Sequence, residues 1–253
     1  HTMGCKSNQF ETSIIKENLS NNGFEEVQDI KNADYFILNS CSVTHKSDNE
    51  AFYHLRNAKH KNASVKTVLT GCIAQIEKEE LLKNEFIDFV IGNDDKLNLY
   101  KYLIEDTRYI VSDVMKQKKF NEAVLSDTTK TRASLKIQDG CDNRCTYCII
   151  PSLRGPYRSY PMEQLIDEAK RLAHEGVTEI ILVAQETTLY GVDLYGHKTL
   201  PKLLRALAKI DGIHWIRVMY CYPEEIDDEL IDEIAVNPRV CHYLDIPIQH
   251  ASD

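Results

Sequence analysis

The chain has 253 residues, of which 43% are hydrophobic and 27% charged, and its formal net charge at pH 7 is −9. This composition is typical of a globular protein, and the length is enough for one large domain or two ordinary ones. No apolar run approaches the ~18 residues of a membrane span. The acidic balance argues against a protein that grips nucleic acid by its phosphates.

The cysteine content and the N-terminal residues indicate the redox conditions of the compartment in which the protein is expected. Eight cysteines occur, and the opening HTMGCKSNQFETS lacks the hydrophobic region of a secretory signal. We therefore expect a reducing compartment, the cytoplasm, where cysteines serve metals or catalysis rather than disulfides. The half comprising residues 131–253 holds 13 Lys and Arg against 19 Asp and Glu, and is the more acidic half at −6. Such a surface suits a basic protein substrate.

In residues 1–105, short β-rich runs alternate with helical patterns. Strands are expected at 35–41 (YFILNSC), 66–72 (KTVLTGC) and 89–92 (FVIG), with TMGC as the end of another. Helices are expected over 11–23, 45–61 and 76–85, and Gly23 is a suitable residue to end the first of them. Alternation of this kind predicts a parallel sheet.

Three cysteines of this region each follow a predicted strand immediately. They are Cys5, Cys41 and Cys72, which we call the first triplet. In open α/β sheets, ligands bind outside the carboxyl ends of the strands. The first triplet could therefore converge on one site although ~30 residues separate its members in sequence. Three buried structural thiols are the alternative, because free cysteine is among the most buried residue types.

The rest of the chain divides into a linker and a second domain. Residues 106–131 have weak periodicity, with a short strand expected at 109–111 and a small basic cluster at Lys116, Lys118 and Lys119. From residue 132 onwards, strands are expected near 133–137, 178–184, 214–219 and 242–247, with helices over 162–176, 200–210 and 224–237. Four parallel strands with intervening helices predict a partial (β/α) barrel, truncated at the C-terminus. The expected fold class is α/β, an N-terminal parallel-sheet domain (1–105) followed by this partial barrel (132–253).

The stretch GCDNRCTYCII carries a second cysteine cluster. Its members are Cys141, Cys145 and Cys148, which we call the second triplet. A structural zinc site needs four ligands, and so does an ordinary 4Fe–4S ferredoxin site. Three thiolates on a four-iron cluster leave one iron without a protein ligand, which is useful only if another molecule binds there. A redox iron–sulfur protein and a zinc-stabilised nucleic-acid-binding module remain as alternatives.

The CxxxCxxC pattern after the first strand of an α/β barrel resembles the radical S-adenosylmethionine (SAM) superfamily. In that superfamily the amino and carboxylate groups of SAM bind the open iron, and reductive cleavage of SAM gives a 5′-deoxyadenosyl radical. KIQDGCDNRCTYCIIPSLRGPYRS, preceded by an α/β domain with three spread cysteines, resembles the methylthiotransferase family. The contexts GCKSNQFE, NSCSVT and TGCIAQ of the first triplet are also similar to that family. The resemblance implies two 4Fe–4S clusters: an auxiliary cluster on the first triplet and the radical SAM cluster on the second.

The two halves resemble different branches of this family. LVAQETTLYGVDLYG, IRVMYCYPEEI and YLDIPIQHASD resemble the RimO branch, which methylthiolates an aspartate of a small-subunit ribosomal protein. GCKSNQFETSIIKENL is closer to the MtaB branch, which acts on a modified adenosine of tRNA. The resemblance thus implies a ribosomal-protein substrate, with tRNA modified next to the anticodon as the alternative (MtaB/MiaB-like). It also implies a sulfur donor and an electron donor such as flavodoxin or ferredoxin.

The resemblance further suggests which residues contact SAM. They are an aromatic residue inside the second triplet and polar residues at or near barrel strand ends, namely Tyr147, Gln185, Glu186, Arg217, Asp245 and Gln249. Each has a simpler interpretation; Tyr147 could be a packing aromatic, and Arg217 could pair with an acidic neighbour. Arg154 and Arg158 could meet substrate or brace their loop. Cys221 and Cys241 are expected to be packing residues.

Overall fold

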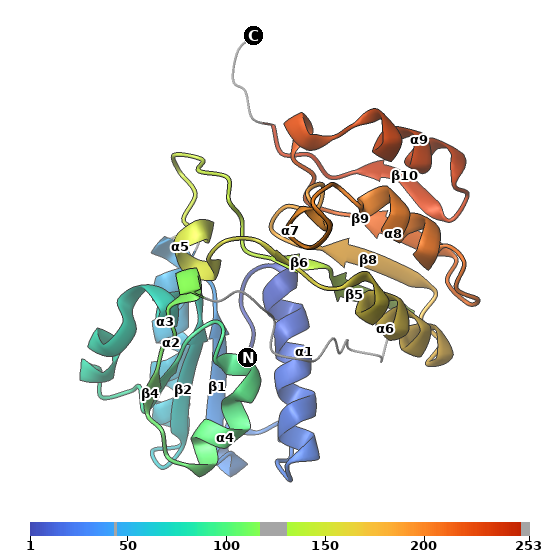
Figure 1. The fold of residues 1–253 in the computed structure, drawn as a ribbon. Helices are drawn as coiled ribbons and strands as arrows, with labels where there is room; N and C mark the ends of the chain where they lie inside the picture. The colour runs from blue at the N-terminus through green and yellow to red at the C-terminus, as the bar shows by residue number, and fades with distance from the viewer. Residues whose placement is uncertain (43–44, 117–130, 249–253) are drawn as a thin grey trace. The chain divides into compact units, whose positions relative to one another are not determined.

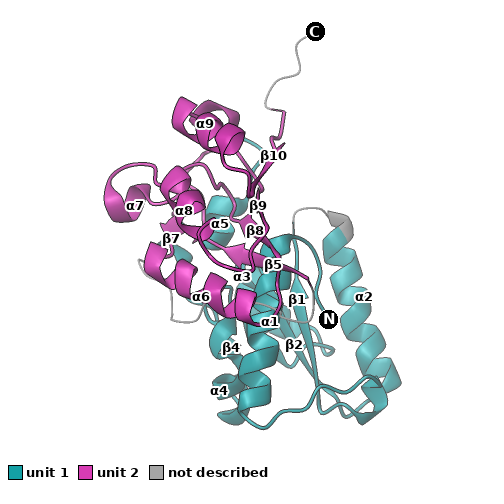
Figure 2. Cartoon of the chain, turned by 90° about the vertical axis from the view of Figure 1, so that its right-hand side faces the viewer, with its two compact units in different colours: residues 1–117, 145–155 teal, residues 118–144, 156–253 magenta. Residues whose placement is uncertain are grey.

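The computed structural model describes residues 1–42, 45–116 and 131–248. The chain forms two compact units (Figure 2), unit 1 with residues 1–117 and 145–155 and unit 2 with residues 118–144 and 156–253. The sequence predicted a linker over residues 106–131 between two domains, 1–105 and 132–253. In the structure, the short segment 145–155, which includes α5 (Ile150–Arg154), packs with unit 1. Lys118 and Lys119 of the predicted basic cluster lie outside the described residues.

Unit 1 is built on a parallel four-stranded sheet (Figure 1). Its strands lie in chain order, β1 (Tyr35–Ser40), β2 (Lys66–Gly71), β3 (Phe89–Ile91) and β4 (Tyr109–Ile110). A parallel bridge joins Thr2 to Asn39 on the open side of β1, so the start of the chain also runs along the sheet. The four strands form where the sequence predicted them. Their near-continuous apolar runs are what a parallel sheet covered on both faces requires.

Helices cover both faces of this sheet. Against one face pack α2 (His45–Lys61) and α3 (Cys72–Glu77), whose Leu55 and Ile73 join Leu38 and Leu69 of the strands. Against the other pack α1 (Lys6–Asn21) and α4 (Leu99–Ile104). Short 3-10 helices connect these elements: η1 (Ile30–Asn32), η2 (Lys78–Lys83), η3 (Lys96–Asn98) and η4 (Val114–Lys116).

Two helices of unit 1 begin earlier than the sequence predicted. The first was expected from residue 11, but α1 begins at Lys6, directly after the extended residue Cys5. Its first two turns bury the polar side chains of Ser7 and Asn8, so apolar periodicity did not reveal them. The helix expected over 76–85 likewise begins at Cys72, and a positive φ of 52° at Lys78 separates it from η2.

Unit 2 contains a second parallel sheet, with the order β10 (Val240–Leu244), β9 (Trp215–Val218), β8 (Glu179–Val183) and β5 (Arg132–Lys136). Three helices pack against one face of it, α6 (Met162–His174), α8 (Leu200–Leu207) and α9 (Asp228–Val236). Alternate strand residues such as Leu135, Leu182 and Val218 point into this core. The opposite face therefore carries the intervening residues, among them Glu179 and Arg217. This is the βα arrangement of a partial barrel, as predicted.

Smaller elements of unit 2 were not predicted. A two-stranded antiparallel ribbon pairs β6 (Gln138–Asp139) with β7 (Arg158–Ser159), and α7 (Val192–Tyr195) and η5 (Pro223–Glu225) lie in loops after strands. Strands of two residues are too short to show an alternating pattern. Among the residues that the structure describes, no helix is long and apolar enough to cross a membrane.

Candidate functional site

The first triplet lies at the carboxyl ends of parallel strands in unit 1. Ser40 and Gly71, the last residues of β1 and β2, are paired in the sheet, so Cys41 and Cys72 leave neighbouring strands at the same level. Cys5 follows the short extended segment that bridges to Asn39. Cys41 and Cys72 are 6% and 3% exposed, whereas Cys5 is exposed.

Two glycines allow the triplet to pack this closely. A Cβ atom added to Gly4, whose φ is +86°, would lie 2.6 Å from the Cys41 Sγ atom. A Cβ atom added to Gly71, whose φ is +90°, would lie 2.4 Å from the carbonyl oxygen of Ser40. Only glycine combines these backbone angles with such close approach. The glycines preceding Cys5 and Cys72 therefore serve to bring the three cysteines together.

The electrostatic surroundings of Cys72 include the two other cysteines of the first triplet and two cations. Burial raises the pKa of the Cys72 thiol, the positive charges of Arg154 and Lys96 oppose this, and Cys41 and Cys5 raise the pKa further. A metal ligand must be a thiolate. The buried cations therefore favour the form of Cys72 that a metal centre needs, against the effect of burial.

An iron–sulfur cluster on the first triplet stays a prediction. Within the described ranges, no three His, Cys, Asp or Glu side chains stand close enough together to hold one ion. Thiolates of a four-iron cluster each bind a different iron and are spaced more widely than the ligands of one ion. The buried cations beside Cys72 also suit a group that carries several thiolate charges.

The second triplet is distributed over the two units. Cys141 belongs to unit 2 and follows Gly140, whose φ is 77°, whereas Cys145 and Cys148 belong to unit 1. All three thiols are half-buried, and none of them forms a disulfide. The backbone N–H of Cys148 donates to the carbonyl of Cys145 at 3.0 Å, which forms a tight turn between these two. The side chain of Tyr147 in this turn is 79% exposed, so it is not a packing aromatic within unit 1.

Gln185 and Glu186 follow β8 at the carboxyl edge of the unit 2 sheet. Gln185 is half-buried, and its Oε1 atom accepts from the backbone N–H of Gly140 at 2.9 Å, so it braces the residue before Cys141. Glu186 is buried and accepts from the backbone N–H groups of Thr188 at 2.7 Å and Leu189 at 3.2 Å. Burial raises the pKa of Glu186 against these hydrogen bonds. Both side chains therefore hold the backbone of loops at the carboxyl edge of the unit 2 sheet, and a ligand bound at this edge would contact those loops.

The remaining predicted SAM contacts of unit 2 have protein partners. Arg217 donates from Nε to Glu179 at 2.8 Å, with its guanidinium 5.3 Å from the ring centroid of Tyr243. Asp245 accepts from the backbone N–H of Tyr220 at 3.1 Å. These contacts match the simpler interpretation of Arg217, and a role in binding SAM stays a prediction for both. Gln249 lies outside the described residues.

Arg154, Arg158 and the two other cysteines occupy structural positions. Arg154 is 2% exposed and pairs with Glu11 of α1 at 2.6 Å, within unit 1. Arg158 is buried in unit 2, 3.8 Å from Asp139. Cys221 is fully buried, which raises the pKa of its thiol to about 11, and Cys241 is half-buried in β10. No pattern in the sequence pointed to Lys96, which is 1% exposed and joins the Glu11–Arg154 pair.

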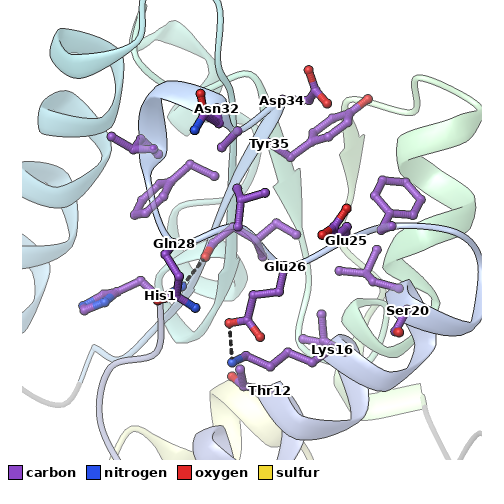
Figure 3. Close-up of a pocket in the computed structure, with 18 of the residues that line it drawn as sticks. His1, Thr12, Lys16, Ser20, Glu25, Glu26, Gln28, Asn32, Asp34 and Tyr35 are labelled. Atoms are coloured by element: carbon purple, nitrogen blue, oxygen red, sulfur yellow. Dashed lines mark hydrogen bonds and ion pairs between the residues drawn. The ribbon is translucent and has the colours of Figure 1, made fainter.

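A pocket of about 1090 Å³ opens in unit 1 between α1 and the segment leading into β1 (Figure 3). The Lys16–Glu26 ion pair, at 2.6 Å, and the terminal amino group of His1, which donates to Ile37 at 2.8 Å, lie on its wall. No residue of either triplet and no predicted SAM contact lines it. It is therefore separate from the candidate site.

Two family descriptions match the chain. Residues 1–92 match the uncharacterized protein family UPF0004, and residues 135–253 match the radical SAM superfamily. The first match contains the whole first triplet, and the second contains the whole second triplet.

Curated relatives match along the whole chain. The ribosomal protein uS12 methylthiotransferases RimO of Lachnoclostridium phytofermentans and Clostridium kluyveri are each 44% identical over 100% of this chain and over 59% and 58% of their own lengths. The chain thus spans about three fifths of these relatives. The fold is also similar to a solved structure, that of the radical SAM methyltransferase TsrM from Kitasatospora setae with cobalamin and a [4Fe-4S] cluster bound. The TM-score is 0.64 and the sequence identity 14%, and the match covers 96% of this chain and 58% of TsrM. At that identity the likeness concerns the fold.

Proposed function

The chain belongs to the radical SAM methylthiotransferase family, and from this premise we propose that it inserts sulfur into an unactivated C–H bond and that the sulfur is then methylated. The proposed substrate is an aspartate of the small-subunit ribosomal protein uS12. The observation that carries the proposal is the pair of cysteine triplets, each short of the four ligands of a closed site.

We assign a 4Fe–4S cluster to each triplet, with separate tasks. When bound, the cluster on the second triplet and SAM supply the 5′-deoxyadenosyl radical, while the auxiliary cluster on the first triplet supplies sulfur, and a second SAM supplies the methyl group. The chain's own residues hold these groups: Cys5, Cys41 and Cys72 at the strand ends of unit 1, and Cys141, Cys145 and Cys148 in the loop after β6. Tyr147, Gln185, Glu186, Arg217, Asp245 and Gln249 remain the proposed SAM contacts.

The choice of substrate is supported by the relatives' names and by charge. Both relatives described above act, by name, on uS12. The half of the chain that carries the barrel strands is the more acidic, and ribosomal proteins are generally basic, so complementary charge would favour their encounter. The tRNA alternative is supported by the N-terminal resemblance alone, and tRNA binding would require a positive surface.

Substrate choice can be tested directly with the reconstituted chain. It is supplied with SAM, a reductant and sulfide, and offered either a peptide from uS12 that carries the target aspartate or tRNA that carries the unthiolated adenosine. Mass spectrometry should find the added methylthio group on the aspartate. Modification of tRNA alone would refute the ribosomal substrate while leaving the radical chemistry intact. A chain that binds iron but never cleaves SAM would instead favour a simple redox protein.

The proposal also requires partners and a compartment. An electron donor such as flavodoxin or ferredoxin would reduce the clusters, and a sulfur donor would restore the sulfur consumed in each turnover. We place the reaction in the cytoplasm, because none of the eight cysteines forms a disulfide and reducing conditions would keep them in the thiol form.

A further inference from the structure

A cluster of three charged side chains lies buried in unit 1. Glu11 of α1 accepts from Lys96 of η3 at 2.5 Å and from Arg154 of α5 at 2.6 Å. The exposed fractions of the three are 4%, 1% and 2%. One carboxylate is thus shared by two basic side chains. The three side chains, which we call the cationic trio, carry one net positive charge when both bases are protonated; burial lowers the pKa of Lys96, and the charge of Glu11 opposes that effect.

The trio contains one more buried charge than is needed for a neutral ion pair that anchors α1. Removing an ion from water costs several kcal/mol, and a single neutral ion pair would already anchor α1 to either partner. A second buried cation adds desolvation cost and repels the first. An anionic neighbour would offset this cost.

One asparagine connects the trio to the backbone beside two cysteines of the first triplet. Arg154 donates to the side-chain oxygen of Asn8 at 2.9 Å, and the amide nitrogen of Asn8 donates to the carbonyls of Met3 at 3.0 Å and Ser40 at 2.8 Å. These carbonyls lie just before Cys5 and Cys41. The trio thus reaches two of the three cysteine loops through one amide.

Lys96 lies near the third loop through a second asparagine, Asn39. Its ammonium lies 3.4 Å from the side-chain oxygen of Asn39. A Cβ atom added to Gly71, the residue before Cys72, would lie 2.7 Å from that same oxygen. The hydrogen-bond partners of the two cations are therefore bonded to residues before Cys5 and Cys41, through Asn8, and lie beside the residue before Cys72, through Asn39.

We propose that the cationic trio is the electrostatic support of the auxiliary centre: its net positive charge, held beside Cys5, Cys41 and Cys72, stabilises a negatively charged, thiolate-bound iron–sulfur cluster and its reduced form in particular. Lys96 and Arg154 are positioning residues in this scheme. This inference rests on the proposed function, because it takes the first triplet to hold the cluster.

The consequence is a shift in the cluster's reduction potential. Reduction adds one electron from an external reductant and leaves the cluster one charge more negative, so a nearby fixed cation favours the reduced form. At a fixed solution potential, removing one buried positive charge should lower the ratio of reduced to oxidised cluster by a factor on the order of ten. For a one-electron couple, a tenfold change corresponds to about 59 mV.

The test isolates the auxiliary cluster by replacing the second triplet with alanine in the full chain. In this background Lys96→Met removes one charge and leaves a neutral Glu11–Arg154 pair, and Lys96→Arg restores the charge. Lys59→Met is a matched control, because it removes another ion-paired lysine of unit 1, bound to Asp88 at 2.6 Å. Each variant is reconstituted with iron and sulfide, its iron is measured, and its cluster is titrated electrochemically with detection by electron paramagnetic resonance.

We expect parent-level iron and a roughly tenfold lower reduced fraction in Lys96→Met, with Lys96→Arg and Lys59→Met close to the parent. A folded Lys96→Met chain that loses the cluster, with recovery in Lys96→Arg, would also support the proposal. An unchanged potential in Lys96→Met, or an equal shift in Lys59→Met, would overturn it. Should Lys96→Met fail to fold, Arg154→Met removes the same charge from the other side of Glu11 and should give the same shift. Absence of iron from the background protein itself would refute the two-cluster assignment instead.

Discussion

Gly71 is the position where one added methyl group should most disturb the first triplet. Its backbone angles, φ 90° and ψ −151°, lie in a region that is essentially restricted to glycine. The strain of placing alanine there is about 1–3 kcal/mol. The new Cβ would also lie 2.4 Å from the carbonyl oxygen of Ser40, a backbone atom of the neighbouring strand that cannot rotate away.

The expected loss of unfolding free energy for Gly71→Ala is therefore about 3–4 kcal/mol, from backbone strain and the clash together. Gly23→Ala provides a matched control in the same unit, since Gly23 has a φ of +85° but nothing within 4 Å of an added Cβ. That variant should lose only about 1 kcal/mol, from strain alone.

Urea unfolding of unit 1, followed by circular dichroism, measures both changes. With a denaturant dependence of about 2 kcal/mol per M, the two midpoints should differ by about 1–1.5 M urea. The backbone can relieve this clash only by shifting residue 71, and this shift also moves the adjacent Cys72. The Gly71→Ala variant should therefore bind less iron at the first triplet, whereas the Gly23→Ala variant should bind as much iron as the parent. Equal losses of stability in the two variants, or full iron in Gly71→Ala, would refute the packing argument.

Replacing the second triplet by alanine should halve the iron bound after anaerobic reconstitution, from about eight to about four atoms per chain, and abolish reductive SAM cleavage; iron at the parent level would contradict the assignment. Replacing the first triplet should also halve the iron but leave cleavage to 5′-deoxyadenosine, and loss of cleavage in a folded variant with its second cluster intact would be incompatible with the proposed division of tasks. Burial tends to raise the pKa of Asp88, but bonds from Lys59 and Thr67 outweigh it and hold that pKa below its usual value. This carboxylate therefore contributes stability that is present at neutral pH and lost as the pH falls through its lowered pKa. Asp88→Asn should cost about 1–2 kcal/mol at pH 7, and its difference from the parent in urea unfolding should disappear on acidification; a difference that persists unchanged in acid would argue against this ion pair.

The parallel sheets were predictable because their strands are buried on both faces or nearly so. Runs such as YFILNS and EIILV have few residues that could lie in water, and turn or helix signals flank them. The α/β class and the order of the main strands followed from these runs. The start of α1 did not, because its first turns bury polar residues that hydrogen-bond to neighbouring strands, and a search for apolar periodicity passes over them.

The candidate cysteines could also be named from the sequence. The second triplet has a fixed local spacing, and each member of the first follows a strand, so the topology of a parallel sheet implies that their loops meet at one edge. Their proximity needed the structure to be seen, through the close approach of Gly4 to Cys41 and the effect of Cys5 and Cys41 on the pKa of Cys72.

The sequence by itself determined the α/β fold class, the principal strands and helices, and the two triplets, because each is encoded by local spacing or by a repeated strand–helix pattern. Only the tertiary structure revealed the cationic trio and the partner of Arg217. Glu11 and Arg154 are 143 residues apart, and a charged residue on a helix is ordinarily interpreted as solvent-exposed. Whether such a residue is buried depends on which distant charge the fold brings to it, and long-range packing of that kind leaves no periodic signal along the chain.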